Sequence, residues 1–230
     1  MPPDSPQQIP SDRIAAIDAW FPQTQCTRCG YPNCRAYAEA IAQGAAAINR
    51  CPPGGEATLT GLARLLSRPY LSLDPAYGAP RPRVRAEIDE ALCIGCRKCL
   101  EVCPVDAILG ARRLMHSVIA SECTGCELCL PPCPVDCIRL VPAAVAPQAG
   151  RWPDYTNEET ARARRRCEQR LTRYARRQAQ RIAKAQAAPD AACGRPDSAR
   201  KKAEIRAAVV RVREKRRQRA ALHSPPENDS

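Results

Sequence analysis

The apolar residues of this chain occur in short stretches, which predict small elements rather than one large core. Ile14 and Ile17 fall on one face of a predicted short helix. Ser11 or Asp12 can cap the start of that helix. Residues 35–48 are rich in alanine and contain no proline, so they predict a second helix.

The middle of the chain predicts one more helix and then short strands. Residues 56–66 place leucines at helical spacing along one side. Residues 67–83 contain several prolines and predict a semi-rigid linker. Beyond the linker, the pattern predicts three short strands at 84–88, 116–120 and 138–141.

The end of the chain predicts helices with little apolar surface. Residues 156–159 read Thr-Asn-Glu-Glu, which fits a capping box, and the chain favours helix from there to residue 187. A second helix can start at Asp197 or Ser198. The apolar stripe of the first helix is thin, which argues against deep burial. It consists of Cys167, Leu171, Tyr174 and Ile182.

The composition limits the size of any hydrophobic core. The 230 residues include 15 cysteines but only six Tyr, two Trp and one Phe. Small domains with so few large side chains usually need metals or cross-links, and metal binding then contributes to folding. The chain opens without a signal peptide and contains no run of ~18 apolar residues. Because cysteines that hold iron need a reducing compartment, we expect a cytoplasmic protein.

The net charge of +12 comes from the end of the chain. Residues 1–150 contain 14 Lys and Arg and 14 Asp and Glu, whereas residues 151–230 contain 22 and 10. Four thiolates around an oxidised four-iron core leave about −2 at each site, so a loaded body would be acidic and the tail basic. Such a tail can attach the protein to an acidic partner or an anionic membrane, or fold back on its own body.

Two cysteine runs between residues 93 and 133 carry the strongest chemical signal. Each has the spacing C-x2-C-x2-C-x3-C-P, which is the run of bacterial ferredoxins with two [4Fe–4S] clusters. In that pattern the first three cysteines of a run hold one cluster, and the fourth crosses over to the other. The predicted ligands are Cys93, Cys96, Cys99 and Cys133 for one cluster, and Cys103, Cys123, Cys126 and Cys129 for the other.

Residues beside these ligands fit the same interpretation. Gly95 and Gly125 allow a tight bend that brings backbone N–H groups near sulfur. Pro104 and Pro134 can start a helix after the fourth ligand. Tetrahedral zinc and disulfides are the alternatives, although zinc prefers two separated pairs of cysteines.

A third cysteine set lies near the start of the chain. Cys26, Cys29 and Cys34 have the spacing C-x2-C-x4-C, and Cys51 follows the predicted helix at 35–48. That helix can return the chain so that Cys51 supplies a fourth ligand. The spacing indicates a metal site, with iron–sulfur preferred over zinc. The prediction is therefore three [4Fe–4S] clusters in all.

Three cysteines and one notable histidine remain. Cys137 stands where the first run has Ala107, which indicates a small packing residue. Cys167 and Cys193 have no partner at metal spacing and are predicted to be free thiols. His116 is predicted to pack or to hydrogen-bond near a cluster rather than to ligate. The sequence contains no acid–base pair, nucleophile constellation, phosphate loop or dinucleotide fingerprint, so we expect an electron conductor without an active site of its own.

Three features together resemble one family. They are the segment C-T-R-C-G-Y-P-N-C-R-A-Y-A-E-A-I-A with C-P-P-G-G, the dicluster ferredoxin that follows, and the phrase M-H-S-V-I-A-S-E-C-T-G-C-E-L-C-L-P-P-C-P-V-D-C-I. Over about residues 11–142 the set is similar to the B subunit, which is the iron–sulfur subunit, of Rnf/Rsx-type electron-transport complexes. These complexes are the ion-translocating oxidoreductases of bacterial inner membranes. The first module alone also resembles the cluster domain of corrinoid iron–sulfur proteins.

The resemblance implies an electron-wiring subunit of a translocase. It would work between a soluble ferredoxin or a flavin- or NADH-linked partner and the membrane part that moves ions. A related version keeps a redox-sensing transcription factor reduced. Typical members begin with a membrane-anchoring helix that this sequence lacks, and the arginine-rich tail lies outside the family's core pattern. We therefore expect peripheral attachment to the cytoplasmic face of the inner membrane, with other subunits of the complex as partners and no nucleic acid.

The predicted fold class is α+β, built from small metal-stapled domains. A disordered start at 1–10 precedes a helical [4Fe–4S] domain at 11–66. A proline-rich linker at 67–83 leads to a dicluster ferredoxin-like ββ/α domain at 84–142. Residues 143–230 are predicted to form a basic tail that is helical or partly disordered. The first alternative is a soluble polyferredoxin-type electron carrier. The second and less favoured alternative is a nucleic-acid-associated cluster protein.

Overall fold

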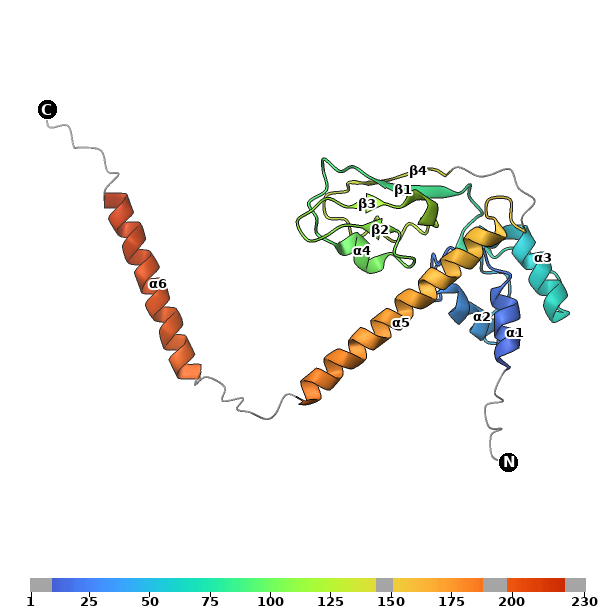
Figure 1. Ribbon diagram of the computed structural model, residues 1–230, viewed down its shortest axis with the longest axis horizontal. Helices are drawn as coiled ribbons and strands as arrows, with labels where there is room; N and C mark the ends of the chain where they lie inside the picture. The colour runs from blue at the N-terminus through green and yellow to red at the C-terminus, as the bar shows by residue number, and fades with distance from the viewer. Residues whose placement is uncertain (1–9, 144–150, 188–197, 222–230) are drawn as a thin grey trace. The chain divides into compact units, whose positions relative to one another are not determined.

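The computed structural model describes residues 10–143, 151–187 and 198–221 (Figure 1). They divide into two compact units whose boundary falls inside helix α5 (Asn157–Ala187), between Arg176 and Arg177. The first unit holds all the predicted cluster ligands, and the second holds the rest of α5 and helix α6 (Ser198–Ala221). Cys193 and nearly all of the predicted disordered start lie outside the described residues.

The first domain is helical, as the apolar pattern predicts. It contains α1 (Ser11–Asp18), α2 (Cys34–Ala42), the short 3-10 helix η1 (Pro52–Gly54) and α3 (Gly55–Leu66). Its core includes Phe21 and Tyr37, whose rings stack with centroids 5.0 Å apart. Small side chains between the helices let these short elements approach closely enough to bury that pair.

Two sequence-based details of this domain are wrong. Neither Ser11 nor Asp12 caps α1: the N-cap position is Pro10, and no side chain caps the helix. The second helix ends at Ala42 rather than at residue 48, because Gly44 adopts a φ of +74° and turns the chain out of the helix.

The predicted linker packs back onto the first domain. Asp74 donates its backbone N–H to the carbonyl of Asn49 at 3.0 Å, and the Asn49 side chain donates to the carbonyl of Ser72 at 2.9 Å. The Arg50 guanidinium lies over the Tyr77 ring, 5.2 Å from its centroid. Tyr77 ends the short 3-10 helix η2 (Pro75–Tyr77). These contacts fix the path of the linker toward the second domain.

The second domain consists of two small antiparallel pairs of strands. Strand β1 (Val84–Ile88) pairs with β4 (Ile138–Pro142), so that the ends of the domain's chain lie side by side. Strand β2 (Ile108–Leu109) pairs with β3 (Ser117–Val118). The strands expected at 84–88 and 138–141 are confirmed, while the one expected at 116–120 shrinks to Ser117–Val118.

Helices occur in this domain, but not where the prolines suggested. Pro104 and Pro134 each begin a turn, so the prediction that they start helices is wrong. Asp106 and Asp136 follow these turns with φ values of +49° and +47°, which a helix cannot contain. The helix of the first repeat is instead α4 (Lys98–Val102), which ends just before Cys103, and the short 3-10 helix η3 (Ala120–Glu122) precedes Cys123.

Helix α5 starts with the predicted capping box and continues along the body of the first unit. The Glu159 N–H donates to Thr156 Oγ1 at 3.1 Å, and the Thr156 N–H donates back to the Glu159 carboxylate at 2.9 Å. Trp152, just before the helix, is buried and donates from Nε1 to Thr58 Oγ1 at 2.9 Å. Thus the first part of the basic tail belongs to the compact unit that holds the ligands. None of the described helices is long and apolar enough to span a bilayer.

Candidate iron–sulfur sites

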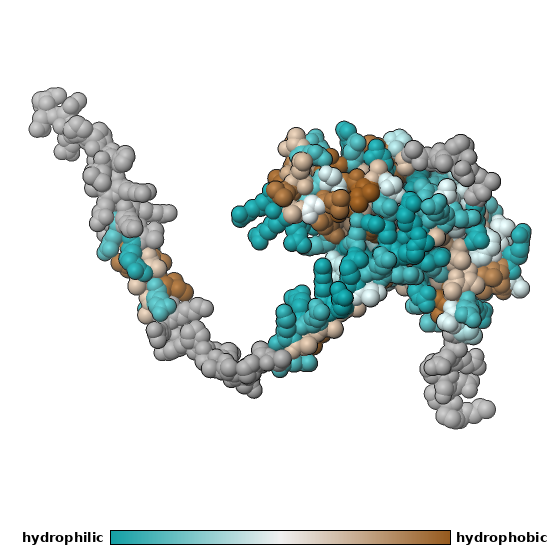
Figure 2. All heavy atoms as spheres, in the orientation of Figure 1, coloured by the Kyte–Doolittle hydropathy of each residue, from teal (hydrophilic) through white to brown (hydrophobic). Residues whose placement is uncertain are grey.

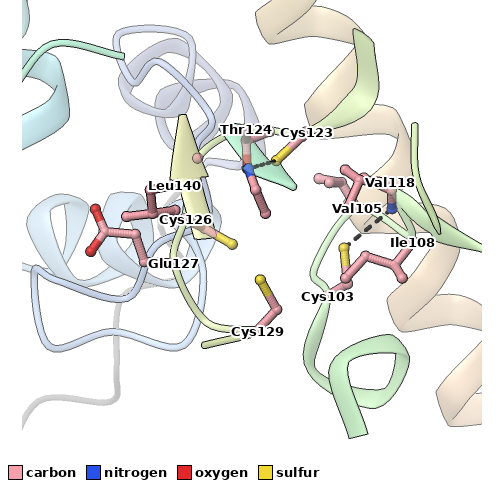
Figure 3. Close-up of a pocket in the computed structure, with 13 residues that line it drawn as sticks. Cys103, Val105, Ile108, Val118, Cys123, Thr124, Cys126, Glu127, Cys129 and Leu140 are labelled. Carbon is pink, nitrogen blue, oxygen red and sulfur yellow. Dashed lines mark hydrogen bonds between the residues drawn. The ribbon is translucent and has the colours of Figure 1, made fainter. Parts of the chain in front are cut away.

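Four predicted ligands from two different runs face one cavity in the second domain. Cys103, Cys123, Cys126 and Cys129 line one hollow, and their sulfur atoms point toward it (Figure 3). The rest of the lining is largely apolar. We call these four cysteines site 3. The structure therefore brings Cys103 to the three cysteines of the other run, as the ferredoxin crossover requires.

Backbone N–H groups point at the sulfur atoms of site 3. Ala86 donates to Cys123 Sγ at 3.3 Å, and Ala107 donates to Cys103 Sγ at 3.2 Å. Hydrogen bonds of this kind stabilise negative charge on ligating sulfur and tune cluster potentials. Burial raises the pKa of Cys126 and of Cys129 to about 12, and the neighbouring thiols contribute. Ligation must therefore displace protons from these thiols.

Glycine is required in the loops between the first two ligands of each run. Gly125 has a φ of +69°, and a Cβ at this position would lie 2.3 Å from the carbonyl oxygen of Val84. Gly95 has a φ of +67°, and its Cβ would lie 2.5 Å from the backbone nitrogen of Leu114. Both the backbone conformation and the close approach exclude a side chain, as the sequence predicts.

The other predicted set of the second domain, site 2, comprises Cys93, Cys96, Cys99 and Cys133. Cys93 and Cys99 both contact His116. The backbone N–H of His116 donates to Cys93 Sγ at 3.4 Å, and the ring Nδ1 of His116 lies 3.3 Å from Cys99 Sγ. The His116 ring is buried, in keeping with a packing and hydrogen-bonding role. Cys96, by contrast, is exposed.

Cys133 adjoins a fifth thiol, that of Cys137. The two sulfur atoms lie 3.6 Å apart, and Cys137 is buried in the core of the domain. Burial raises the pKa of Cys137 to about 12, and the thiols of Cys133 and Cys93 contribute to that rise. Cys137 is thus a small buried residue, as predicted, but it also packs directly against a predicted ligand of site 2.

The first domain holds the third predicted set, site 1: Cys26, Cys29, Cys34 and Cys51. Cys34 opens helix α2, and Cys51 precedes η1, so a helix terminus positions each of them. Burial raises the pKa of Cys34, and the thiols of Cys51 and Cys26 raise it further. Burial also raises the pKa of Cys51, with Cys26 and Cys29 adding to the rise. The four thiols therefore share one electrostatic neighbourhood.

Two buried glutamines link Asp18 to site 1 by hydrogen bonds, which we call the glutamine chain. Sequence reasoning missed them. Gln23 donates to the Asp18 carboxylate at 3.0 Å, and Gln25 donates to Gln23 Oε1 at 2.8 Å. Gln25 then accepts the backbone N–H of Cys34 at 2.9 Å. Gln23, Gln25 and Thr27 have φ values of +57°, +56° and +59°. Such strained backbone is usual at binding sites, and alternating left-handed residues turn N–H groups toward an anion.

The loops of site 1 and site 3 are joined directly. Thr124 Oγ1 donates to the carbonyl of Thr24 at 2.9 Å in a buried contact. Arg28 and Glu127 form an ion pair of 2.7 Å. All four residues lie within two positions of Cys26 or Cys126. The two cysteine loops therefore lie against each other.

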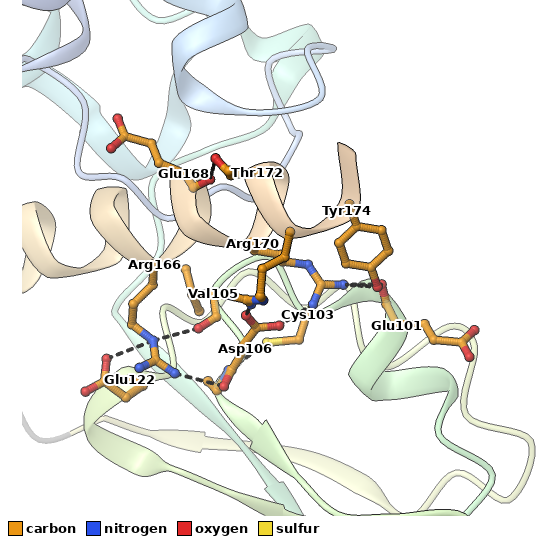
Figure 4. A network of polar contacts seen from close by, with 12 residues as sticks. Glu101, Cys103, Val105, Asp106, Glu122, Arg166, Glu168, Arg170, Thr172 and Tyr174 are labelled. Atoms are coloured by element: carbon orange, nitrogen blue, oxygen red, sulfur yellow. Dashed lines mark hydrogen bonds and ion pairs between the residues drawn. The ribbon is translucent and has the colours of Figure 1, made fainter. Parts of the chain in front are cut away.

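Helix α5 holds the loop that carries Cys103. Arg166 donates to the carbonyls of Val105 and Asp106 at 2.7 and 2.9 Å, and Arg170 pairs with the Asp106 carboxylate (Figure 4). Arg173 pairs with the same carboxylate. Burial raises the pKa of the Cys103 thiol, and the positive charge of Arg170 opposes part of that rise. Sequence reasoning missed these contacts, because arginines on a polar helix are usually solvated.

The same helix reaches the first domain. Arg164 pairs with the buried carboxylate of Asp18 at 2.6 Å, where the glutamine chain of site 1 begins. Arg162 and Arg166 both pair with Glu122, next to Cys123, at 3.3 Å. One helix thus contacts the supports of both site 1 and site 3.

The donor set of site 3 fits an iron–sulfur cluster. Site 3 offers four thiols around one hollow with N–H groups directed at sulfur, and this is what a cubane with four thiolate ligands needs. In the described part of the chain, no three His, Cys, Asp or Glu side chains are gathered as a site for a single metal ion.

Comparisons with known proteins point the same way. Residues 86–140 match a family described as "4Fe-4S dicluster domain", and residues 21–53 match one described as "Putative Fe-S cluster". No solved structure matches the chain.

Several curated proteins of one name are similar to more than half of this chain. The B subunit of the ion-translocating oxidoreductase complex of Azoarcus sp. (strain BH72) is 56% identical over 139 residues, which are 60% of this chain and 76% of that protein. The protein of the same name from Alkalilimnicola ehrlichii is 56% identical over 147 residues, 64% of this chain and 79% of that protein. The one from Hahella chejuensis is 61% identical over 130 residues, 56% of this chain and 66% of that protein.

Proposed function

Because this chain belongs to the family of B subunits of the ion-translocating oxidoreductase complex, it is an iron–sulfur electron-transfer subunit, and we propose that it holds three [4Fe–4S] clusters. Sites 1, 2 and 3 as defined above are the proposed ligand sets. A bound [4Fe–4S] cluster accepts and releases one electron at a time. The single observation that carries the proposal is the hollow of site 3, where thiols from both runs converge.

The chain's own residues determine which sites adjoin. The Thr24–Thr124 and Arg28–Glu127 contacts support site 1 lying beside site 3. Cys99 of site 2 and Cys129 of site 3 are buried in the same core. Burial raises the pKa of the Cys129 thiol, and the nearby Cys99 thiol raises it further. We infer the order site 1, site 3, site 2 along the chain's electron path.

The complex supplies the wider context of the proposal. We propose that the protein works with other subunits of the complex and exchanges electrons with a soluble ferredoxin or a flavin- or NADH-linked partner. The coupled process is ion translocation or the reduction of a redox-sensing regulator. The proposed location is peripheral, on the cytoplasmic face of the inner membrane.

The basic residues that remain exposed support an electrostatic attachment. Arg181 and Lys184 of α5 and Arg206 and Arg211 of α6 are exposed in the second unit. Each cation near an anionic membrane surface contributes about 1 kcal/mol. The nucleic-acid alternative has less support, because several tail arginines contact the protein's own body, Arg170 among them.

Iron and sulfide analysis of the full chain tests the cluster count. Anaerobically prepared protein should contain about twelve iron and twelve sulfide per chain. Replacing Cys34 with Ala should lower both toward about eight, while the matched control Cys167→Ser should leave them unchanged. Zinc in place of iron, or a visible spectrum without iron–sulfur absorption, would rule the proposal out.

A magnetic measurement tests the order of the sites. Paramagnetic resonance of the fully reduced protein should show spin coupling, which weakens with distance. Removing site 1 through Cys34→Ala should sharpen the signal of site 3 and leave the signal of site 2 nearly unchanged. A larger change at site 2 would contradict the inferred order.

A further inference from the structure

Exposed apolar residues occur in the loop that carries the exposed thiol of site 2 and in the loop packed against it. Four large side chains of the two adjoining loops are between 55% and 63% exposed. They are Leu92, Ile94, Leu114 and Met115. Figure 2 shows brown, apolar atoms gathered on the second domain, with teal side chains beside them. A soluble protein rarely leaves several such residues together without a use for them.

The two loops form one continuous surface. Arg113 donates its N–H to the carbonyl of Gly95 at 3.0 Å, and Gly95 packs against the backbone of Leu114. Ile94 and Cys96 are the sequence neighbours of Gly95, and both are exposed. On the same loop, Met115 precedes His116, which donates to Cys93. The apolar side chains therefore border the site 2 loop.

Cations border this apolar surface. Arg97 and Lys98 follow Cys96, and Arg112 and Arg113 precede Leu114. All four are exposed, and none forms an ion pair with a described residue. The arginines of α5 that touch the body, by contrast, have carboxylate or carbonyl partners.

Two carboxylates lie at the edge next to Leu92, and both already have partners. Asp89 accepts the N–H of Ala91 at 3.0 Å, and Glu90 accepts the hydroxyl of Ser117 at 3.0 Å. Asp89 caps a local turn, Glu90 bonds to the other loop, and neither carboxylate forms an ion pair with any of the four cations. The surface thus combines exposed apolar side chains with a basic edge.

The three sites differ in how much protein covers them. The first domain and α5 lie against the loops of site 3, and the thiols of site 1 are buried or half-buried. Site 2 alone presents an exposed predicted ligand, Cys96. Electron transfer to another protein favours a short distance to the surface, and site 2 offers one.

We propose that the surface formed by Leu92, Ile94, Leu114 and Met115 with the four cations docks a small acidic electron-transfer protein. The proposal rests on the proposed function, since it assumes that site 2 carries a cluster. Apolar contact at the centre supplies affinity, and the basic edge attracts and orients an acidic partner. The exposed ligand Cys96 in the same loop distinguishes this surface from a membrane contact, which would need no redox centre beneath it.

Charge reversal at the edge tests the docking surface. The variant is R112E/R113E in the full chain, and the matched control is R13E/R64E, which reverses two exposed cations of the first domain. The probe is a small acidic bacterial [4Fe–4S] ferredoxin, reduced and mixed anaerobically with the oxidised chain. The rate constant of electron transfer should fall about tenfold or more in R112E/R113E at low salt and stay unchanged in the control. The difference should vanish near 1 M salt, where the screening length is about 3 Å.

A second variant and a binding measurement complete the test. I94Q/L114Q should weaken the equilibrium affinity for the same ferredoxin about tenfold, while L65Q in α3 should not. Iron content and reduction by dithionite should remain normal in all variants. If dithionite failed to reduce the unaltered chain, this result would refute the proposed function rather than the docking surface. Equal rates and affinities in variant and control would overturn the docking surface. Loss of binding to anionic vesicles with unchanged ferredoxin rates would overturn it too and assign the surface to the membrane.

Discussion

Thr124 donates a hydrogen bond of 2.9 Å to the carbonyl of Thr24, across a separation of 100 residues in the sequence. Each of these threonines stands two positions before a predicted ligand, Cys126 or Cys26. The bond is buried and joins the two iron–sulfur domains beside their cysteine loops. Its position means that the alignment of the two loops depends on a few polar contacts rather than on a large apolar interface.

Removing this bond should loosen the domains without disturbing either core. Thr124→Val keeps the side-chain shape but leaves the Thr24 carbonyl without its partner, which costs about 1–3 kcal/mol. Clusters should therefore be lost several-fold faster at a fixed guanidinium concentration, measured by visible absorbance. Thr60→Val is the control, because Thr60 is exposed and its hydroxyl donates to Glu56 of its own helix. Equal rates for the two variants would show that this contact does not hold the domains together.

The crossover of ligands gives a second prediction. Cys103→Ala should damage the cluster of site 3, although Cys103 belongs to the first run, because its sulfur faces the same hollow as Cys123, Cys126 and Cys129. Cys133→Ala should correspondingly damage site 2. Paramagnetic resonance of the reduced variants identifies which signal is lost. If Cys103→Ala removed the signal that depends on Cys93 while the other stayed intact, the ligand assignment would be wrong.

The cysteine sets were accessible from sequence because ligand spacing is a local property. A C-x2-C-x2-C run forces three thiols into one loop, whatever the rest of the chain does. Strand β2 could also have been found, since the segment P-V-D-A-I at 104–108 repeats as P-V-D-C-I at 134–138, which enters β4. The glutamine chain could not have been found from the sequence, because glutamine does not indicate the positive φ that Gln23 and Gln25 adopt.

The role of α5 was hidden for a different reason. Arg166 and Arg170 contact residues about 60 positions earlier in the chain, including carbonyls that the left-handed turn at Asp106 exposes. A pattern of charges along a helix does not show whether the charges meet water or a partner. The notion that the tail folds back on its body is therefore right for residues up to Arg176, and the reason lies in specific carbonyl and carboxylate partners.

The hydrogen bonds and ion pairs between α5 and the Cys103 loop give a third prediction. Arg170→Met removes a buried guanidinium that holds the Asp106 carboxylate and the carbonyl of Glu101. Hydrogen bonds to charged groups contribute about 1.5–3 kcal/mol, so the body should lose about 2 kcal/mol of stability. The midpoint potential of site 3 should also fall, because a nearby positive charge favours the reduced cluster.

A matched variant separates this effect from the loss of charge on the helix. Arg176→Met alters an exposed arginine further along α5. Redox titration with visible and paramagnetic detection should show an unchanged potential for this control. A common shift in both variants would mean that only the overall charge of the helix matters.

Cys167 provides a fourth prediction, as a reporter of α5 docking. The thiol is buried against the second domain, and burial raises its pKa to about 11. Only the thiolate reacts with iodoacetamide, and at pH 8 about one thiol in a thousand is ionised. In a Cys193→Ser background the loaded protein should therefore resist labelling at Cys167, and labelling should speed up as the pH rises toward 11.

The reporter becomes informative when combined with the arginine variant. Arg170→Met should increase labelling of Cys167 at pH 8, located by mass spectrometry of the peptide, whereas Arg176→Met should not. Fast labelling of Cys167 in the unaltered chain at pH 8 would show that α5 does not stay packed on the body.

The boundary between the two compact units gives the last prediction, which separates folding from attachment. A chain ending at residue 176 keeps Trp152, the Arg164–Asp18 pair and the arginines that hold the Cys103 loop. We expect it to retain all three clusters. A chain ending at residue 150 loses those contacts, including the arginines that hold the Cys103 loop and the cation that pairs with Asp18, so its clusters should be lost faster. The two chains should differ in cluster content after overnight anaerobic incubation.

The chain ending at residue 176 also tests what the second unit does. If its exposed cations attach the protein electrostatically, the chain ending at residue 176 should be fully loaded but absent from the membrane fraction at low salt. The complete chain should be recovered there and released by 0.5 M salt, since screening weakens contacts between exposed charges. Recovery of the truncated chain with membranes at low salt would place the attachment on the first unit instead. Loss of clusters on removal of residues 177–230 would show that the second unit supports the fold, and the attachment would then need a separate test with charge-reversed variants of α6.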